Sequence, residues 1–269
     1  MRTTVLTLLT ALALLVGLTV LDTAEAATPA YKVTLHTSVA KSTAEHFIVV
    51  SGTVTGPKAA GHTVTIQRRY VGGPWITVAT ATISSRGRYK ARVETPRGGT
   101  TSFRAIKSRS SVRRAGVSAV RSIPVYRWIN LAGQNSLDNI NDSNLQTGIE
   151  ETVSGKTAPS VDMYADGDVE YKLSGLCSRL TFTAAYTGTS PASMSVDVVK
   201  TPINGGPSTT VPGVVNTGTP LPVQTSLSGF RYVLLETNGY DSGNKLVVWN
   251  PQVYCNADQL PAFVLDDLK

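Results

Sequence analysis

The chain of 269 residues has a formal net charge of +7, and this charge is distributed unevenly. Residues 28–127 contain 17 Lys and Arg against 2 Asp and Glu, whereas residues 128–269 contain 7 against 14. Apart from the stretch near the N-terminus, no apolar run is long enough to span a bilayer, so a multi-span membrane protein is excluded. Two modules of opposite charge in one molecule favour binding over chemistry.

The N-terminus has the pattern of an export signal. Arg2 precedes an apolar stretch over residues 5–21, and Ala24-Glu25-Ala26 is a small-x-small cleavage site. We expect residues 1–26 to be a signal peptide and the protein to be secreted and extracellular, with no membrane attachment after cleavage. An uncleaved N-terminal anchor is the alternative, because the apolar stretch approaches the length of a membrane span.

The basic half, residues 27–127, has the composition of strands and turns. Val, Ile and Thr are abundant, and Gly, Pro and Ser interrupt them at short intervals. Seven short strands in about 100 residues predict an antiparallel sandwich. The expected strands cover residues 31–37, 46–54, 63–70, 75–82, 87–94, 101–107 and 117–125.

Four segments of this half carry a family resemblance: residues 50–54, 64–69, 75–79 and 85–89. They resemble the bacterial immunoglobulin-like repeats of secreted actinobacterial proteins. The resemblance implies an immunoglobulin-like sandwich that acts as a spacer or an adhesive module. It supplies no fixed site whose residues could be transferred to this chain.

Cationic side chains alternate with apolar ones in the basic half, so one face of its strands is expected to be positive. One interpretation is a solvated face that keeps the sandwich soluble. The other is a footing on a polyanion, such as an anionic wall polymer. Nucleic acid is not an expected partner, because no nucleic-acid motif occurs. The candidate polyanion-binding residues, expected on neighbouring strands, are Arg68, Arg69, Arg86, Arg88, Lys90 and Arg92.

The acidic half follows without a long flexible linker, because residues 126–128 lead directly into it. This predicts a semi-rigid junction, and we expect Trp128 to be buried there or in the second core. The strands expected in this half are residues 147–153, 160–164, 169–173, 179–186, 193–200, 221–225, 230–237 and 245–254. They predict a jelly-roll sandwich over residues 128–258, with a tail at 259–269. Residues 204–220 are expected to form a long surface loop.

The two cysteines, Cys177 and Cys255, both lie in the acidic half. In an exported protein such a pair is most simply a disulfide. On the chain-entropy model it would contribute roughly 4.5 kcal/mol. It would join an early strand region to the end of the last long strand.

The acidic half also carries a resemblance, over residues 169–175, 180–184, 195–198, 228–236 and 244–251. Their order is similar to that in the NPCBM module, a carbohydrate-binding domain often attached to glycoside hydrolases. The resemblance implies a galactose-binding-like jelly roll. The overall expectation is therefore an all-β protein with an immunoglobulin-like sandwich followed by a jelly roll.

Sugar recognition needs an aromatic face and planar amide or carboxylate groups on rigidly held loops. Tyr240, Asp241 and Asn244 offer this chemistry in one loop, and Tyr164 and Asp166 in a second. Both loops also have the composition of ordinary turns, which is the competing interpretation. Trp249 is the last candidate carbohydrate-binding residue; its position within a strand also suits a core residue.

Neither a cofactor nor a catalytic residue is expected. The sequence contains neither a His-Glu-x-x-His nor a Gly-x-Ser-x-Gly motif. A carboxylate pair assembled from distant strands is not excluded by sequence. Structural calcium is an open alternative, without EF-hand spacing. Its oxygen ligands would come from one of two acidic segments, with Asp162, Asp166, Asp168 and Glu170 in one and Asp138, Asn139, Asn141 and Asp142 in the other.

The sequence therefore predicts a secreted, non-catalytic protein that binds carbohydrate or adheres to a cell surface. The expected partner is a glycan or cell-wall polysaccharide. The alternative is a structural or protein-binding extracellular factor without affinity for sugar.

Overall fold

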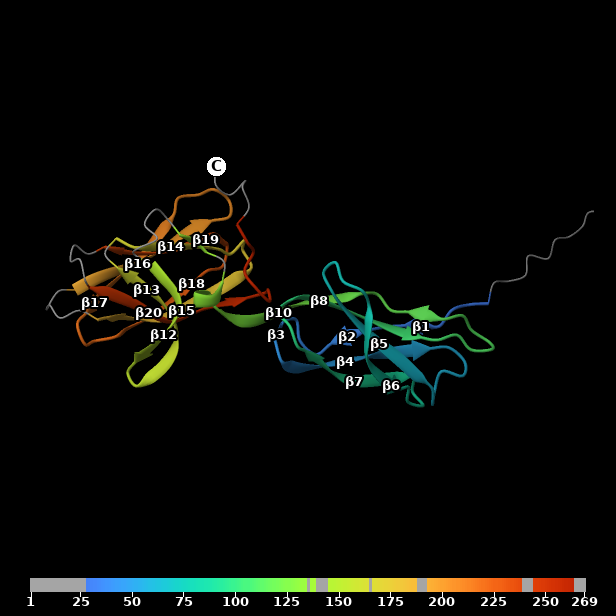
Figure 1. The fold of residues 1–269 in the computed structure, drawn as a ribbon. Coiled ribbons are helices and arrows are strands. Elements are labelled where there is room, and N and C mark those ends of the chain that lie inside the picture. Colours follow the sequence, from blue (N-terminus) through green and yellow to red (C-terminus); the bar gives the residue numbers. More distant parts are fainter. Residues whose placement is uncertain are drawn as a thin grey trace, which may run out of the picture.

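A computed structural model describes residues 28–134, 136–138, 145–164, 166–187, 193–238 and 244–263. Two β-sandwiches lie end to end and share the strand β10, as Figure 1 shows. A single 3-10 turn, η1 (Leu131–Gly133), is the only helical element in the described ranges. Among these residues no helix is long and apolar enough to cross a membrane. The fold class is all-β, as predicted.

The N-terminal sandwich consists of two sheets. In the first, β4 pairs with β1 and β2 along one edge and with β7 along the other. In the second, the strand order is β6-β5-β8-β10, with β3 parallel to β10. This order is the immunoglobulin-like arrangement. The strands are β1 (Lys32–Val33), β2 (His36–Thr37), β3 (Ser42–Thr43), β4 (His46–Thr55), β5 (Thr63–Tyr70), β6 (Ile76–Thr82), β7 (Arg88–Thr95), β8 (Gly99–Lys107), β9 (Gly116–Val117) and β10 (Arg121–Asn130).

Alternation along the strands builds the core of this sandwich. On β7, Tyr89 and Val93 are buried, whereas the residues between them that carry charge are exposed. The same period of two on β5 buries Val64 and Ile66. These side chains pack with Phe103 and others from both sheets into one apolar cluster.

The C-terminal sandwich also has two sheets, and the chain crosses between them repeatedly. One has the order β12-β13-β20-β15-β18 and the other β11-β14-β19-β16-β17. This crossing pattern is that of a jelly roll. The strands are β11 (Leu137–Asp138), β12 (Leu145–Val153), β13 (Lys156–Tyr164), β14 (Asp168–Lys172), β15 (Cys177–Tyr186), β16 (Ser193–Pro202), β17 (Thr209–Asn216), β18 (Leu221–Ser226), β19 (Phe230–Asn238) and β20 (Lys245–Cys255).

One expectation about this half is wrong. Residues 204–220 do not form one long loop, because β17 occupies the middle of the segment and pairs with β16 along its whole length. Pro212 and Gly213 hide the strand in the sequence. Since β17 is the edge of its sheet, a proline without an N–H group is tolerated there.

The disulfide between Cys177 and Cys255 is confirmed. It joins the first residue of β15 to the last residue of β20, which pair directly in the same sheet. Both sulfur atoms lie in the apolar core. The bond therefore closes the end of the C-terminal sandwich that is nearest to the junction.

Strand β10 connects the two sandwiches without interruption. Residues 121–125 pair with β8 of the N-terminal sandwich, and residues 127–130 pair with β20 of the C-terminal one. The predicted boundary between residues 127 and 128 thus falls inside one strand. The paired sheets of the two sandwiches form a single hydrogen-bonded surface across the junction.

Candidate functional site

The loops predicted to bind a ligand lie at the end of the C-terminal sandwich away from the junction. Tyr164, at the end of β13, pairs with the first residue of β20. Asp166 forms the next turn with φ 57°, and the Gly167 N–H donates to the Tyr164 carbonyl at 2.9 Å. Asn244, just before β20, is only 9% exposed. Tyr240 and Asp241 lie outside the described residues. The structure thus brings Tyr164, Asp166 and Asn244 to one end.

Trp249 lies apart from these loops, on the outer face of the sheet. Its Nε1 donates to the Glu151 carbonyl at 3.0 Å. The half-buried ring packs against a small apolar cluster of Val153, Ala185 and Val247. These contacts assign Trp249 to packing of the β12–β13 hairpin on the sheet.

A partly buried ion cluster lies on the same face. Lys245 Nζ donates to Glu151 Oε1 at 2.5 Å and to Asp162 Oδ2 at 2.8 Å. Ser160 Oγ donates to Asp162 Oδ1 at 2.9 Å, and Asp162 is 1% exposed. Burial raises the pKa of Asp162 despite these donors, whereas the hydrogen bond from Lys245 lowers the pKa of Glu151. The ammonium group of Lys245 therefore pairs with both carboxylates.

The calcium alternative finds no assembled site in the part of the chain that the structure describes. No group of three or more His, Cys, Asp or Glu side chains is placed there to hold a metal ion. The Asp162 carboxylate already forms an ion pair with Lys245. Asn139, Asn141 and Asp142 lie outside the described residues.

The six candidate polyanion-binding residues do not form one stripe. Arg68 and Arg69 are on β5, in the sheet opposite to β7, so the expectation of neighbouring strands is wrong for them. Arg68 is only 9% exposed, because its Nη1 donates to the Glu94 carbonyl at 2.7 Å. Arg86 lies in the turn before β7. The remaining three, Arg88, Lys90 and Arg92, occupy the exposed face of β7.

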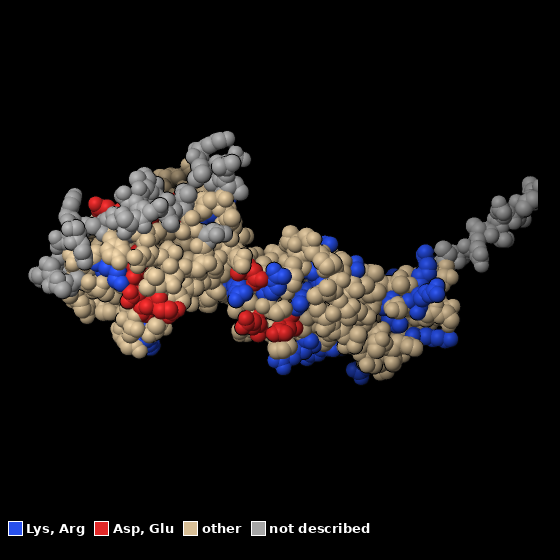
Figure 2. Space-filling model, viewed as in Figure 1, with Lys and Arg blue, Asp and Glu red and all other residues tan. Residues whose placement is uncertain are grey.

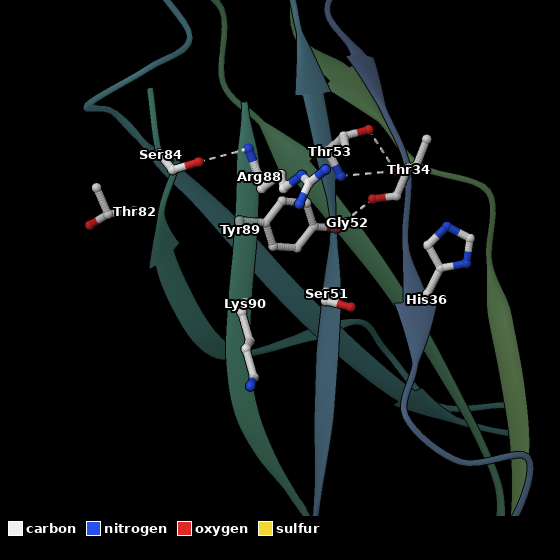
Figure 3. A pocket seen from close by; sticks show the side chains of 10 residues that line it. All are labelled: Thr34, His36, Ser51, Gly52, Thr53, Thr82, Ser84, Arg88, Tyr89 and Lys90. Carbon is white, nitrogen blue, oxygen red and sulfur yellow. Dashed lines mark hydrogen bonds between the residues drawn. The ribbon is translucent and has the colours of Figure 1, made fainter. Parts of the chain in front are cut away.

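A hollow of about 560 Å³ lies beside Arg88 and Lys90. Figure 3 shows these two cations on β7 and His36 on β2, with β4 between them. Hydroxyl groups complete the lining, from Thr34, Ser51, Thr53, Thr82 and Ser84. Cationic side chains that can donate hydrogen bonds, with hydroxyl groups around them, suit an anionic ligand.

Tyr89 forms part of the floor of this hollow. Its hydroxyl donates to the Thr34 carbonyl at 2.5 Å. A Cβ atom at Gly52 would come within 2.0 Å of that carbonyl oxygen, so only glycine permits the contact. Burial raises the pKa of Tyr89 to about 12, so the hydroxyl stays a neutral donor.

Aromatic rings meet where the two sandwiches join. Tyr126 stacks on Tyr254 with ring centroids 5.1 Å apart, and the tilted Trp128 ring has its centroid 5.1 Å from that of Tyr254. Trp128 is 38% exposed, so the expectation that it is buried is wrong. The Tyr254 hydroxyl bonds the Thr43 hydroxyl at 2.8 Å. The Arg179 guanidinium lies 5.9 Å from the Trp128 ring.

A row of amide side chains lies beside the rings. Asn130 pairs with Gln252, and Gln252 pairs with Thr181 on the next strand. Asn130 Nδ2 and Gln252 Nε2 both donate to Asn250 Oδ1, at 3.3 Å and 3.1 Å. These bonds fix the planes of the amides. We call this surface the junction face, and it consists of Tyr126, Trp128, Asn130, Arg179, Thr181, Gln224, Gln252 and Tyr254.

The sequence contains one local signal for the junction face. Tyr126, Trp128 and Asn130 alternate along β10, while Val125 and Ile129 between and beside them are buried. Alternation of this kind places the three polar or aromatic side chains on one face. Their partners on β20 and β15 could not be found without the strand register.

Comparisons with known proteins identify no family for this chain. No family model matches the sequence, and no curated protein matches it. One similar solved structure is the M60 catalytic domain with the CBM51-1 and CBM51-2 domains from Clostridium perfringens ZmpB, at 8% identity and TM-score 0.37. That match covers 78% of this chain and 34% of the other.

Two further structures show the same level of similarity. The CBM51-2 and INT domains of the same Clostridium perfringens protein match at 11% identity and TM-score 0.37, over 60% of this chain and 38% of that one. A structure described as carbohydrate-binding modules from the β-sandwich superfamily matches at 12% identity and TM-score 0.27, over 82% of this chain and 97% of that one. All three TM-scores are below 0.5, and each identity is 12% or lower.

Proposed function

We propose that this protein is exported and binds a glycan without catalysis, through the junction face. The observation that carries the proposal is the half-exposed Trp128 ring beside a row of amides whose planes are fixed. A sugar ring offers an apolar C–H face to an aromatic ring and hydroxyl groups to amides. Both partners are present within neighbouring strand positions of one rigid sheet.

The contact geometry supports a preformed site. Tyr254 is held by the stacked Tyr126 ring and by Thr43, and Trp128 leans on Tyr254. Side chains that are already immobilised lose little conformational entropy when a ligand binds. The strand pairing of β10 with β20 fixes the spacing between the rings and the amides.

The N-terminal sandwich contributes a footing on a polyanion in the same proposal. Its positive charge, together with the hollow lined by His36, Arg88 and Lys90, supports an attraction to an anionic wall polymer. The footing would hold the protein at a charged surface, and the junction face would recognise sugar there.

Replacement of Trp128 by Ala tests the proposal. In a glycan array followed by titration of the best hit, we expect Trp128→Ala to weaken binding at least about tenfold, which corresponds to about 1.4 kcal/mol. Phe47→Ala is the matched control, since Phe47 is an exposed aromatic residue on the other sheet of the N-terminal sandwich. Circular dichroism and thermal unfolding check that both variants are folded.

Two results would overturn the proposal. One is a blank array with the wild-type protein, which would favour a protein-binding or structural role. The other is glycan binding that survives Trp128→Ala at full strength.

A further inference from the structure

A second aromatic site lies on the N-terminal sandwich and resembles the junction face in composition. The Trp75 ring lies between two guanidinium groups, with the Arg69 carbon at 4.6 Å and the Arg104 carbon at 4.3 Å from the ring centroid. Arg104 Nε donates to Gln67 Oε1 at 2.8 Å. Stacking on the ring holds the guanidinium planes while leaving N–H groups at their edges for a ligand.

This second site faces the same side of the joined sheet as Trp128. Arg69 pairs with Ser102 on β8, and Ser102 pairs with Ser122 on β10. The Ser102 and Ser122 hydroxyls bond at 2.8 Å on the outer face. Trp128 is six positions after Ser122 on the same strand, so their side chains share a face. At about 3.3 Å per residue the two positions are roughly 20 Å apart along β10.

The junction keeps the two sites at a fixed separation. Asp258 of the C-terminal sandwich bonds Arg97 Nε at 2.7 Å, Arg127 Nη1 at 3.0 Å and the Gly98 N–H at 3.0 Å. A Cβ atom on Gly98 would lie 2.0 Å from the Ala257 carbonyl oxygen, so the backbones are in close contact. In a long ligand that reaches both sites, the second contact is intramolecular, so it adds affinity without a second loss of translational and rotational entropy.

The charges of the two sites select the class of ligand. Arg69 is exposed, and no ion pair to it is found among the described residues. The two acidic residues of the basic half are Glu45 and Glu94. Glu94 lies on β7, in the opposite sheet. Arg179 adds a cation beside Trp128. Guanidinium groups with free edges bind carboxylate, sulfate or phosphate groups.

We propose that the ligand is an acidic glycan chain that runs across both sandwiches, from the Trp75 site to the junction face. The inference rests on the proposed function for its sugar contact at Trp128. It adds the acidic class of the chain, a minimum length and a second set of binding residues. A sugar ring of the chain contacts Trp128, and its acidic groups bind Arg69, Arg104 and Arg179, with Trp75 holding the first two guanidinium groups in place.

Hyaluronan oligosaccharides provide a defined probe, since uronic acid alternates with an uncharged sugar along the chain. A tetrasaccharide and a dodecasaccharide are titrated by isothermal calorimetry into the full chain. We expect the dodecasaccharide to bind at least about tenfold more tightly, because it alone reaches both sites. A carboxyl-reduced dodecasaccharide should lose most of this gain.

Variants of the second site give the sharper comparison. Arg69→Gln with Arg104→Gln, and separately Trp75→Ala, should lower dodecasaccharide affinity about tenfold and leave tetrasaccharide affinity unchanged. Lys32→Gln with Arg109→Gln is the matched control, because it removes the same charge from exposed positions elsewhere. Thermal unfolding establishes that each variant is folded.

The outcomes separate this inference from the proposed function. If Trp128→Ala abolishes binding of both oligosaccharides while the Trp75-site variants bind like wild type, the function stands and the extended site is refuted. Equal binding of the acidic and reduced chains refutes the acidic class. Failure of the wild-type protein to bind hyaluronan, together with hits on neutral glycans in the array, also refutes the inference alone. A glycan array without any hit for the wild-type protein refutes both the proposed function and this inference.

Discussion

Single carboxylates differ in whether their surroundings stabilise or destabilise the charged form. Asp258 is the stabilised case: burial raises its pKa, but hydrogen bonds from Arg127, Arg97 and the Gly98 N–H outweigh burial and lower it overall. The opposite case is a row of carboxylates across the second sheet of the C-terminal sandwich. There Glu236 pairs with Asp168 on one side and Asp197 on the other.

This row predicts a pH-dependent stability. Burial, together with the charges of Asp197 and Asp168, raises the pKa of Glu236 above its ordinary value of 4.5. The folded state therefore binds the proton more tightly than the unfolded state, and stability falls as the pH rises through the raised pKa. We expect Glu236→Gln to stabilise the protein by roughly 0.2–1 kcal/mol at pH 7.

Chemical denaturation at several pH values measures this effect. The advantage of Glu236→Gln over wild type should shrink as the pH falls toward the ordinary pKa of glutamate, because the wild-type carboxyl then becomes neutral. Glu150→Gln removes an exposed carboxylate far from the row and serves as the control. An advantage that is the same at every pH would contradict the assignment to like-charge repulsion.

At the scale of elements, β10 and β20 determine how the molecule is joined. Each is long, and each pairs with strands on both sides of a boundary. The C-terminal end of β20 is held to β15 by the disulfide. The strand that carries Tyr254 and Gln252 of the junction face is thus fixed at the end where the domains meet.

The disulfide makes a prediction for these elements. Cys177→Ser with Cys255→Ser should lower the stability of the C-terminal sandwich by about 2–4 kcal/mol, because the unfolded chain regains its freedom. Hydrogen exchange should increase in β15 and β20 and stay unchanged in β4 and β7, since both cysteines belong to the C-terminal half. An equal increase in both sandwiches would contradict this view and show that they unfold as one unit.

At the scale of the whole molecule, charge is segregated along the long axis. Figure 2 shows Lys and Arg gathered mainly on the N-terminal sandwich, with Asp and Glu near the junction and on the C-terminal sandwich. Such a distribution orients the molecule toward a polyanion through its N-terminal sandwich. The hollow beside Arg88 and Lys90 is the place where that contact would concentrate.

The footing predicts a salt-dependent interaction of the full chain. Long-chain inorganic polyphosphate is the probe, and we expect it to bind at low salt and to dissociate as ionic strength rises. Arg88→Gln with Lys90→Gln should reduce the slope of log affinity against log salt by about 1 for each cation removed. The control is again Lys32→Gln with Arg109→Gln. If polyphosphate does not bind at low salt, the proposal of a polyanion footing is refuted.

The sequence by itself determined the all-β class, the two sandwiches, most strand positions and the disulfide. It could do so because apolar alternation, turn residues and a single pair of cysteines are local or nearly local signals. It missed β17, since Pro212 and Gly213 interrupt the pattern of a strand that only an edge position permits.

The tertiary structure alone decided which side chains meet. Arg68 and Arg69 read as partners of Arg88 and Lys90, but pairing places them in opposite sheets. Trp128 became a surface residue because β10 continues past the first core and turns its even-numbered side chains outward onto Tyr254. Strand register between distant segments sets these contacts, and register depends on the packing of the whole core rather than on any local stretch of sequence.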